Sequence, residues 1–185
     1  MKRTILCVSI LVLLSSMPAF AQLSAPGADT APKVGDMAPD FALAKNSTSV
    51  GAASVKDLQG KKRVLVMFFP GAFTPGCTTE FTEAGQKFDQ ITALNIEMIG
   101  VSRDMPGAQA AFKTSVGAKN GFVSDPDLSV ITKYGAVNST RTPAQANRYY
   151  FLIDEKGKIV WRSVDAKLIP TDQLIADLTK LLNGK

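Results

Sequence analysis

The chain has 185 residues, 21 Lys and Arg against 16 Asp and Glu, 2 cysteines and no histidine. The absence of histidine excludes a Cys–His dyad, a histidine general base and a His-ligated metal or haem, and two cysteines are too few for a thiolate cluster, so we expect no cofactor. The formal net charge of +5 is modest, and the main basic run is Lys61, Lys62 and Arg63 ahead of a strand, which argues against nucleic acid as a partner.

The first 21 residues have the pattern of a secretory signal peptide. Lys2 and Arg3 precede the apolar stretch 5–14, and Ala19–Ala21 is a small-x-small cleavage motif. The apolar stretch is short of the roughly 20 residues that span a membrane, which makes a retained anchor the weaker alternative. We expect cleavage before Gln22, export to the periplasm or the medium, no membrane attachment afterwards, and a mature net charge of +3 because two basic residues leave without an acid.

A small-residue and Pro/Gly-rich tail is expected at 22–33, followed by one domain at 34–185. A short strand is expected at 41–43. Asp104 is expected to cap the helix predicted at 105–117. From residue 63 onward the hydrophobic pattern predicts a strand at 63–69, a helix at 77–94, a strand at 96–102, a helix at 105–117, a strand at 121–124, a helix at 128–134, a polar loop at 138–147, a hairpin of strands at 148–153 and 158–163, and a final helix from 170. This order predicts an α/β domain with a mixed β-sheet flanked by helices on both faces.

Cys77 lies where the first of these strands turns into the first of these helices. Backbone N–H groups and the helix dipole at such a position favour a charged sulfur, so we expect a thiol pKa below its ordinary value of about 8.5. The alternative is a buried structural cysteine, because free cysteine is among the most buried residue types. Cys7 would leave with the signal peptide, so the mature protein would hold one thiol and no internal disulfide.

The predicted helix has an apolar face that includes the sulfur. Its residues recur at spacings of 4, 3, 4 and 3, and they are Cys77, Phe81, Ala84, Phe88 and Ile91. Burial on that face would disfavour a thiolate, so the charge needs backbone N–H groups, the Thr74 hydroxyl and a cation. Glu80 either complements the first helical turn, as Glu83 does, or orients an arginine.

The pattern Pro70-x-x-x-Thr74-x-x-Cys77 resembles the active-site signature of the peroxiredoxins. The segment 34–41 is similar to the Val-Gly-x-x-Ala-Pro-Asp-Phe segment of that family. The segment 148–159 resembles the arginine-bearing hairpin of its bacterioferritin-comigratory, or Q-type, subfamily, and the likeness spans about residues 34–183. The form Pro-Gly-Ala-Phe-Thr-Pro-Gly-Cys also occurs in type V peroxiredoxins, so both subfamilies stay open.

The resemblance implies a thioredoxin-like fold and a thiol-dependent peroxidase that reduces hydrogen peroxide and organic hydroperoxides. Cys77 would be the nucleophile that becomes a sulfenic acid. Thr74 would hydrogen-bond the thiolate and the peroxide, Arg148 would supply the cation, and Pro70 would shield the sulfur from water. Taken singly, these three have structural explanations, as a turn or cap, a solvated strand arginine and a strand terminator. Arg141 is the competing cation.

The chain departs from many Q-type members at Thr82, where they place a resolving cysteine. The resemblance therefore implies a one-cysteine enzyme resolved by an external thiol: a thioredoxin-like protein, a glutaredoxin or a small thiol. A monomer and a homodimer both fit. Two other classes stay open. A thiol–disulfide oxidoreductase of the same fold would need Cys-x-x-Cys, where this chain has Thr74, and a redox-inactive binding module would need no thiol chemistry.

Overall fold

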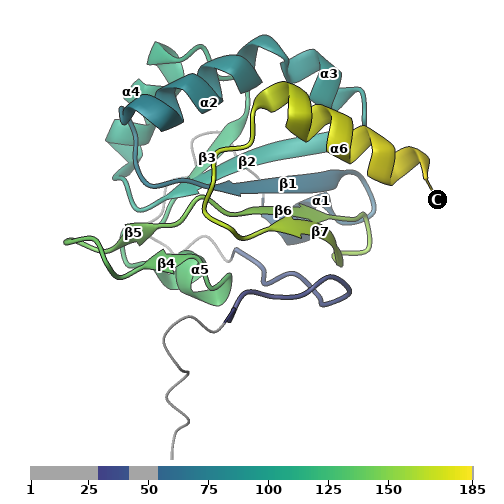
Figure 1. Ribbon diagram of the computed structural model, residues 1–185, viewed down its shortest axis with the longest axis horizontal. Coiled ribbons are helices and arrows are strands. Elements are labelled where there is room, and N and C mark those ends of the chain that lie inside the picture. The colour runs from purple at the N-terminus through teal and green to yellow at the C-terminus, as the bar shows by residue number, and fades with distance from the viewer. Residues whose placement is uncertain (1–28, 42–53, 185) are drawn as a thin grey trace, which may run out of the picture.

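The computed structural model describes residues 29–41 and 54–184 (Figure 1). The predicted signal peptide, Cys7 and most of the tail 22–33 lie outside the described residues. Of the strand expected at 41–43 only Phe41 is described, and it is not in a strand. Among the described residues, no helix has the length and apolar character needed to cross a membrane.

Five strands form one mixed sheet in the order β3-β2-β1-β6-β7. Strands β1, β2 and β3 run parallel, β6 is antiparallel to β1, and β7 is antiparallel to β6. Their bounds are Arg63–Phe68 for β1, Ile96–Ser102 for β2, Gly121–Ser124 for β3, Tyr150–Ile153 for β6 and Ile159–Ser163 for β7. The strands predicted from residue 63 onward are confirmed to within one residue at each end, except that β6 begins two residues later than expected and leaves Arg148 in the preceding loop.

Helices cover both faces of this sheet, as predicted (Figure 1). One face is covered by α2 at Pro75–Gln86, α3 at Phe88–Thr92, α4 at Pro106–Ser115 and α6 at Thr171–Asn183. The other face carries α5 at Ser129–Lys133 and the short α1 at Val55–Leu58. The architecture is the thioredoxin-like α/β fold.

Strand β1 shows why the sequence forms a central strand here. Its side chains alternate between faces, so Val64, Val66 and Phe68 enter the core beneath α1 and α5. Leu65 and Met67 enter the core beneath α2, α3, α4 and α6. Because both faces are buried, the strand is apolar at nearly every position.

The helix predicted at 77–94 is in fact two helices. Thr74 is the N-cap, α2 begins at Pro75, and the backbone of Lys87 (φ −101°, ψ 14°) separates α2 from α3. Proline is well suited to the first helical position because its φ is already helical and its missing N–H has no partner there. Glu80 and Glu83 consequently lie beyond the first turn, so their expected match to the positive helix end is wrong.

Two further expectations are corrected by the structure, and one helix was not predicted. Met105, not Asp104, is the N-cap of α4, because the Asp104 carboxylate accepts the backbone N–H of Ala72 instead. The predicted loop 138–147 contains a small hairpin of β4, Val137–Asn138, and β5, Gln145–Ala146. Helix α1 was not predicted, although Ser54 and Asp57 form a capping box that signals it.

Candidate active site

Cys77 is the third residue of α2, and its side chain is 0% exposed. The first intrahelical hydrogen bond runs from the Thr78 N–H to the Thr74 carbonyl oxygen at 2.9 Å. The N–H groups of the first turn precede that bond and are free of intrahelical partners, so they add positive potential near the sulfur. The sulfur is therefore both desolvated by the core and placed at the positive end of a helix.

Arg148 brings its charge directly to this sulfur. Its Nη2 donates to Cys77 Sγ at 3.0 Å, and its Nε donates to Glu80 Oε2 at 2.9 Å. The Arg148 side chain is 12% exposed and that of Glu80 is 2% exposed, so the ion pair is shielded from solvent. Partial burial lowers the pKa of Arg148, but the charge of Glu80 and the hydrogen bond to it outweigh burial and hold that pKa above its ordinary value.

Glu80 accepts a hydrogen bond from Arg148, which is the contact that the second of its two expected roles requires. The pKa of Glu80 is raised because burial disfavours the carboxylate, and Arg148 and the Tyr150 hydroxyl oppose this rise without cancelling it. The carboxylate form consequently depends on both partners being present. A buried glutamate that loses its arginine would take up a proton rather than stay charged.

Tyr150 completes the network, and the sequence analysis missed it. Its hydroxyl donates to Glu80 Oε1 at 2.6 Å and accepts the Ile169 N–H at 3.4 Å. Burial, reinforced by the charge of Glu80, raises the pKa of Tyr150 well above its ordinary range, so the hydroxyl stays a donor. The available signal was the i, i+2 spacing from Arg148, which places both side chains on one side of an extended segment.

Thr74 and Pro70 lie in the loop that precedes Cys77, and the Thr74 hydroxyl makes a different hydrogen bond from the one expected. The Thr74 hydroxyl donates to the Gly71 carbonyl oxygen at 3.0 Å, and this bond fixes the loop itself. Pro70 and Thr74 line a hollow of about 490 Å³, whose other walls are Gly71, Ala72, Arg103, Asp104, Met105, Ala108, Pro126, Pro143 and Gln145. The competing cation, Arg141, lies between β4 and β5 and is exposed.

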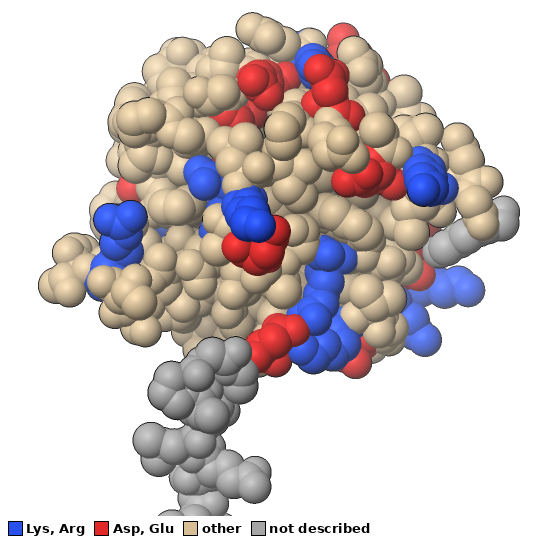
Figure 2. Space-filling view, in the orientation of Figure 1, with Lys and Arg blue, Asp and Glu red and all other residues tan. Residues whose placement is uncertain are grey.

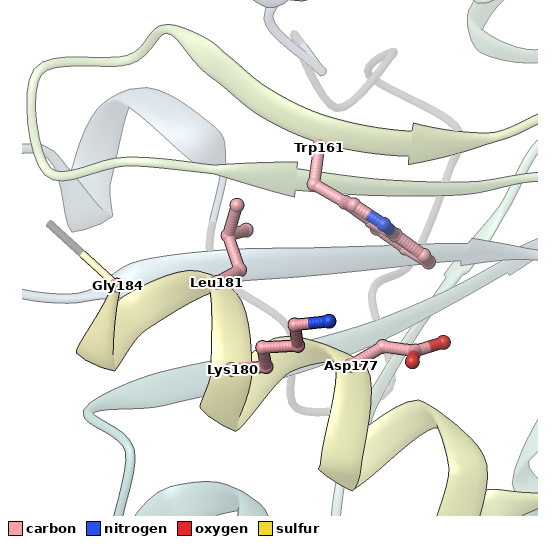
Figure 3. A pocket seen from close by; sticks show the side chains of 5 residues that line it. All are labelled: Trp161, Asp177, Lys180, Leu181 and Gly184. Atoms are coloured by element: carbon pink, nitrogen blue, oxygen red, sulfur yellow. The ribbon is translucent and has the colours of Figure 1, made fainter.

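A second hollow, of about 430 Å³, lies between β7 and α6. Trp161 forms one wall and Asp177, Lys180, Leu181 and Gly184 form the other (Figure 3). It contains none of the predicted site residues.

The described residues also contain no group of three or more Cys, Asp or Glu side chains that could hold a metal ion. Acidic and basic side chains are interspersed over the face shown in Figure 2, so the described residues there present a mixed field.

Comparisons with known proteins show the family and the fold of the chain. The AhpC/TSA family matches residues 34–162. Peroxiredoxin Bcp of Escherichia coli K12 is 32% identical over 131 residues, covering 69% of this chain and 82% of that protein. Two solved structures share the fold. Reduced 2-Cys peroxiredoxin of Plasmodium vivax has a TM-score of 0.70 and 24% identity, and the match covers 82% of this chain and 97% of that chain. Peroxidoxin BcpB of Mycobacterium tuberculosis has a TM-score of 0.68 and 23% identity, and the match covers the same shares of the two chains.

Proposed function

The chain belongs to the AhpC/TSA family of peroxiredoxins and is a thiol-dependent peroxidase, and from this premise we propose that Cys77 is its peroxide-reducing nucleophile. One observation carries the proposal: the 3.0 Å contact between Arg148 Nη2 and Cys77 Sγ, made by a guanidinium that Glu80 holds in place. A cation fixed at this distance favours the thiolate, which is the reactive form of cysteine.

The reaction is a displacement at one peroxide oxygen. The sulfur lone pair forms an S–O bond, the O–O bond breaks, and the departing oxygen leaves as hydroxide or alkoxide and takes a proton from water. Cys77 is oxidised by two electrons to a sulfenic acid, and the peroxide is reduced to water or an alcohol. Arg148 stabilises both the attacking sulfur and the negative charge that develops on the departing oxygen.

Pro70 and Thr74 act on the approach of the peroxide. Pro70 ends the segment from β1 and restricts the access of water to the sulfur. Thr74 caps α2, and its hydroxyl, which bonds Gly71, can turn toward the sulfur and the peroxide when substrate enters. The 490 Å³ hollow is lined by Pro70 and Thr74 but not by Cys77 or Arg148, and its room for an organic group next to the loop supports reduction of organic hydroperoxides as well as hydrogen peroxide.

Resolution of the sulfenic acid requires an external thiol. Cys77 is the one cysteine of the described residues, and Thr82 occupies the position five residues further along α2. A thioredoxin-like protein, a glutaredoxin or a small thiol forms a mixed disulfide with Cys77 and releases water, and a second thiol then frees the enzyme. The reductant is one that reaches an oxidising compartment, because the N-terminal pattern of charge, apolar core and small-residue motif supports export as a periplasmic or secreted protein.

The test of the nucleophile is peroxide consumption with an added dithiol by the mature protein and by Cys77→Ser. The wild type should turn over, and the variant should fall below about 1% of its rate because a serine hydroxyl is not ionised at neutral pH. Equal thermal midpoints would show that the fold is retained. Turnover by the serine variant would refute the assignment of Cys77, and a wild type that exchanges disulfides without consuming peroxide would indicate an oxidoreductase instead.

A further inference from the structure

A second polar network fixes the loop that precedes Cys77. We define residues 70–74 as the active-site loop. Asp104, in the connection after β2, places its Oδ2 at 2.7 Å from the backbone N of Ala72, which donates to it. The same oxygen accepts the Ser102 hydroxyl at 2.7 Å. A charged acceptor makes these bonds stronger than neutral ones, so the loop is tied to the end of β2.

Buried side chains from three elements hold Asp104 in place, its carboxylate through Ser102 and its main chain through Ser124. Gln109 of α4 donates through Nε2 to Ser102 Oγ at 2.8 Å and to the Val123 carbonyl oxygen of β3 at 2.9 Å. The Ser124 hydroxyl donates to the Asp104 carbonyl oxygen at 2.7 Å. Ser102, Gln109 and Ser124 are all 0% exposed. Since buried and hydrogen-bonded side chains have little freedom, the carboxylate meets the loop in one position.

The loop needs such support because its backbone is strained. Phe73 has φ of 61°, in the left-handed region that aromatic residues rarely adopt. Phe73 is 56% exposed, and its ring contacts the ring of Phe112 at 5.4 Å between centroids, so packing supplies only part of what holds this conformation. The hydrogen bond at Ala72 lies just before Phe73 and the bond from Thr74 to Gly71 spans it, so these contacts from both sides hold the strained residue in place.

We propose that Asp104, oriented by Ser102 and Gln109, is a positioning residue for peroxide reduction. The inference rests on the proposed role of Cys77. Asp104 holds the loop that presents Pro70 and Thr74. It takes no part in the bond between Arg148 and Glu80 or in the bond from Arg148 to the sulfur. Loss of Asp104 therefore misplaces the groups that receive the peroxide and leaves the charged sulfur with its cation.

This separation gives a test that general destabilisation would not mimic. In Asp104→Ala the second-order rate constant with hydrogen peroxide should fall about tenfold or more, since small misplacements at a reacting centre have large effects on rate. The rate of Cys77 alkylation by iodoacetamide, and the pH midpoint of thiolate absorbance, should match the wild type. Asp89→Ala removes an 88% exposed carboxylate on α3 and serves as the control that changes neither rate.

Asp104→Asn tests the geometry without relying on the alanine variant to fold. Both loop-fixing bonds end on the same oxygen, so an amide oxygen can accept both, and the peroxide rate should stay within about threefold of the wild type. A peroxide rate of Asp104→Ala within about twofold of the wild type, or an equal loss in the peroxide and iodoacetamide reactions, would overturn the proposal. An asparagine variant as slow as the alanine variant would also overturn it. The Cys77→Ser result is independent of these outcomes, so failure of this inference is distinguishable from failure of the nucleophile assignment.

Discussion

Tyr134 and Tyr150 are both fully buried, on opposite faces of the same sheet. The Tyr134 hydroxyl donates to the carbonyl oxygen of Pro39 at 2.7 Å, whereas the Tyr150 hydroxyl donates to the carboxylate of Glu80 at 2.6 Å. Burial is the largest cause that raises the pKa of each hydroxyl. The difference lies in the acceptor. Tyr134 donates to a neutral backbone carbonyl, whereas Tyr150 donates to a carboxylate that pairs with Arg148, and Arg148 in turn donates to the sulfur.

This comparison shows how the fold separates stability from reactivity. On the face beneath α1 and α5, the buried Tyr134 hydroxyl is satisfied by a neutral backbone carbonyl within an apolar core. The face beneath α2 accepts the desolvation of a carboxylate and a guanidinium, which is unfavourable unless both are paired. Substitutions in the charged network of Tyr150, Glu80 and Arg148 should therefore alter the chemistry. Substitution of Tyr134, which bonds a neutral carbonyl, should alter only the stability of the fold.

The largest effect is expected from Arg148→Met, which removes the cation at the sulfur. The peroxide rate constant should fall about a hundredfold or more, as for loss of a preorganised donor. The pH midpoint of thiolate absorbance should rise by about one unit or more, since a close opposite charge typically shifts ionisation by that amount. Stopped-flow kinetics and absorbance titration measure the two quantities. Arg141→Met, at the exposed arginine, is the matched control, and an unchanged midpoint in Arg148→Met would assign the role elsewhere.

A smaller effect, about tenfold in the peroxide rate, is expected for Glu80→Gln, because a neutral amide orients Arg148 less firmly. The raised pKa of Glu80 also fixes the sign of the pH dependence. Below that pKa the protonated wild type loses the ion pair, so its rate should fall toward acid pH more steeply than that of the glutamine variant, in which only protonation of the thiolate slows the reaction.

The same raised pKa makes a prediction for stability. A raised carboxyl pKa favours the folded state at low pH, and that contribution is lost as the pH rises through the folded-state value. The free energy of unfolding of Glu80→Gln minus that of the wild type should therefore increase as the pH rises. Urea denaturation at a series of pH values measures this, and a difference that declines with pH would contradict it.

The smallest effect on rate is expected for Tyr150→Phe, about threefold, because Arg148 still holds Glu80 after one hydrogen bond is lost. Its partner variant, Tyr134→Phe, should leave the rate unchanged and lower the free energy of unfolding by about 1–2 kcal/mol, since a carbonyl oxygen loses its donor. Peroxide kinetics and urea denaturation of both variants measure the contrast. If the two variants lowered the rate equally, the distinction between the faces would be wrong.

Local sequence was sufficient for the main elements and for the candidate nucleophile. The apolar run at 63–69 and the helical periodicity from Cys77 depend on neighbours within a few residues, and β1 and α2 follow them closely. The break at Lys87 and the hairpin β4–β5 were not predicted, because short helices and two-residue strands carry little periodic signal. Thr74 and Pro70 were identified by spacing, but the bond of Thr74 to Gly71 depends on the turn that the loop adopts.

The sequence by itself determined the order of the main strands and helices and the position of one cysteine at the start of a helix, and its lack of histidine left a dipole, a hydrogen bond or another cation to activate that cysteine. Tertiary structure alone decided which side chains meet: Arg148 and Tyr150 reach Glu80 across about 70 residues of chain, and Asp104, in the connection after β2, accepts the backbone N–H of Ala72. The physical reason is that periodicity records which face of an element is buried, whereas a hydrogen bond between distant segments depends on the register and packing that bring those faces together.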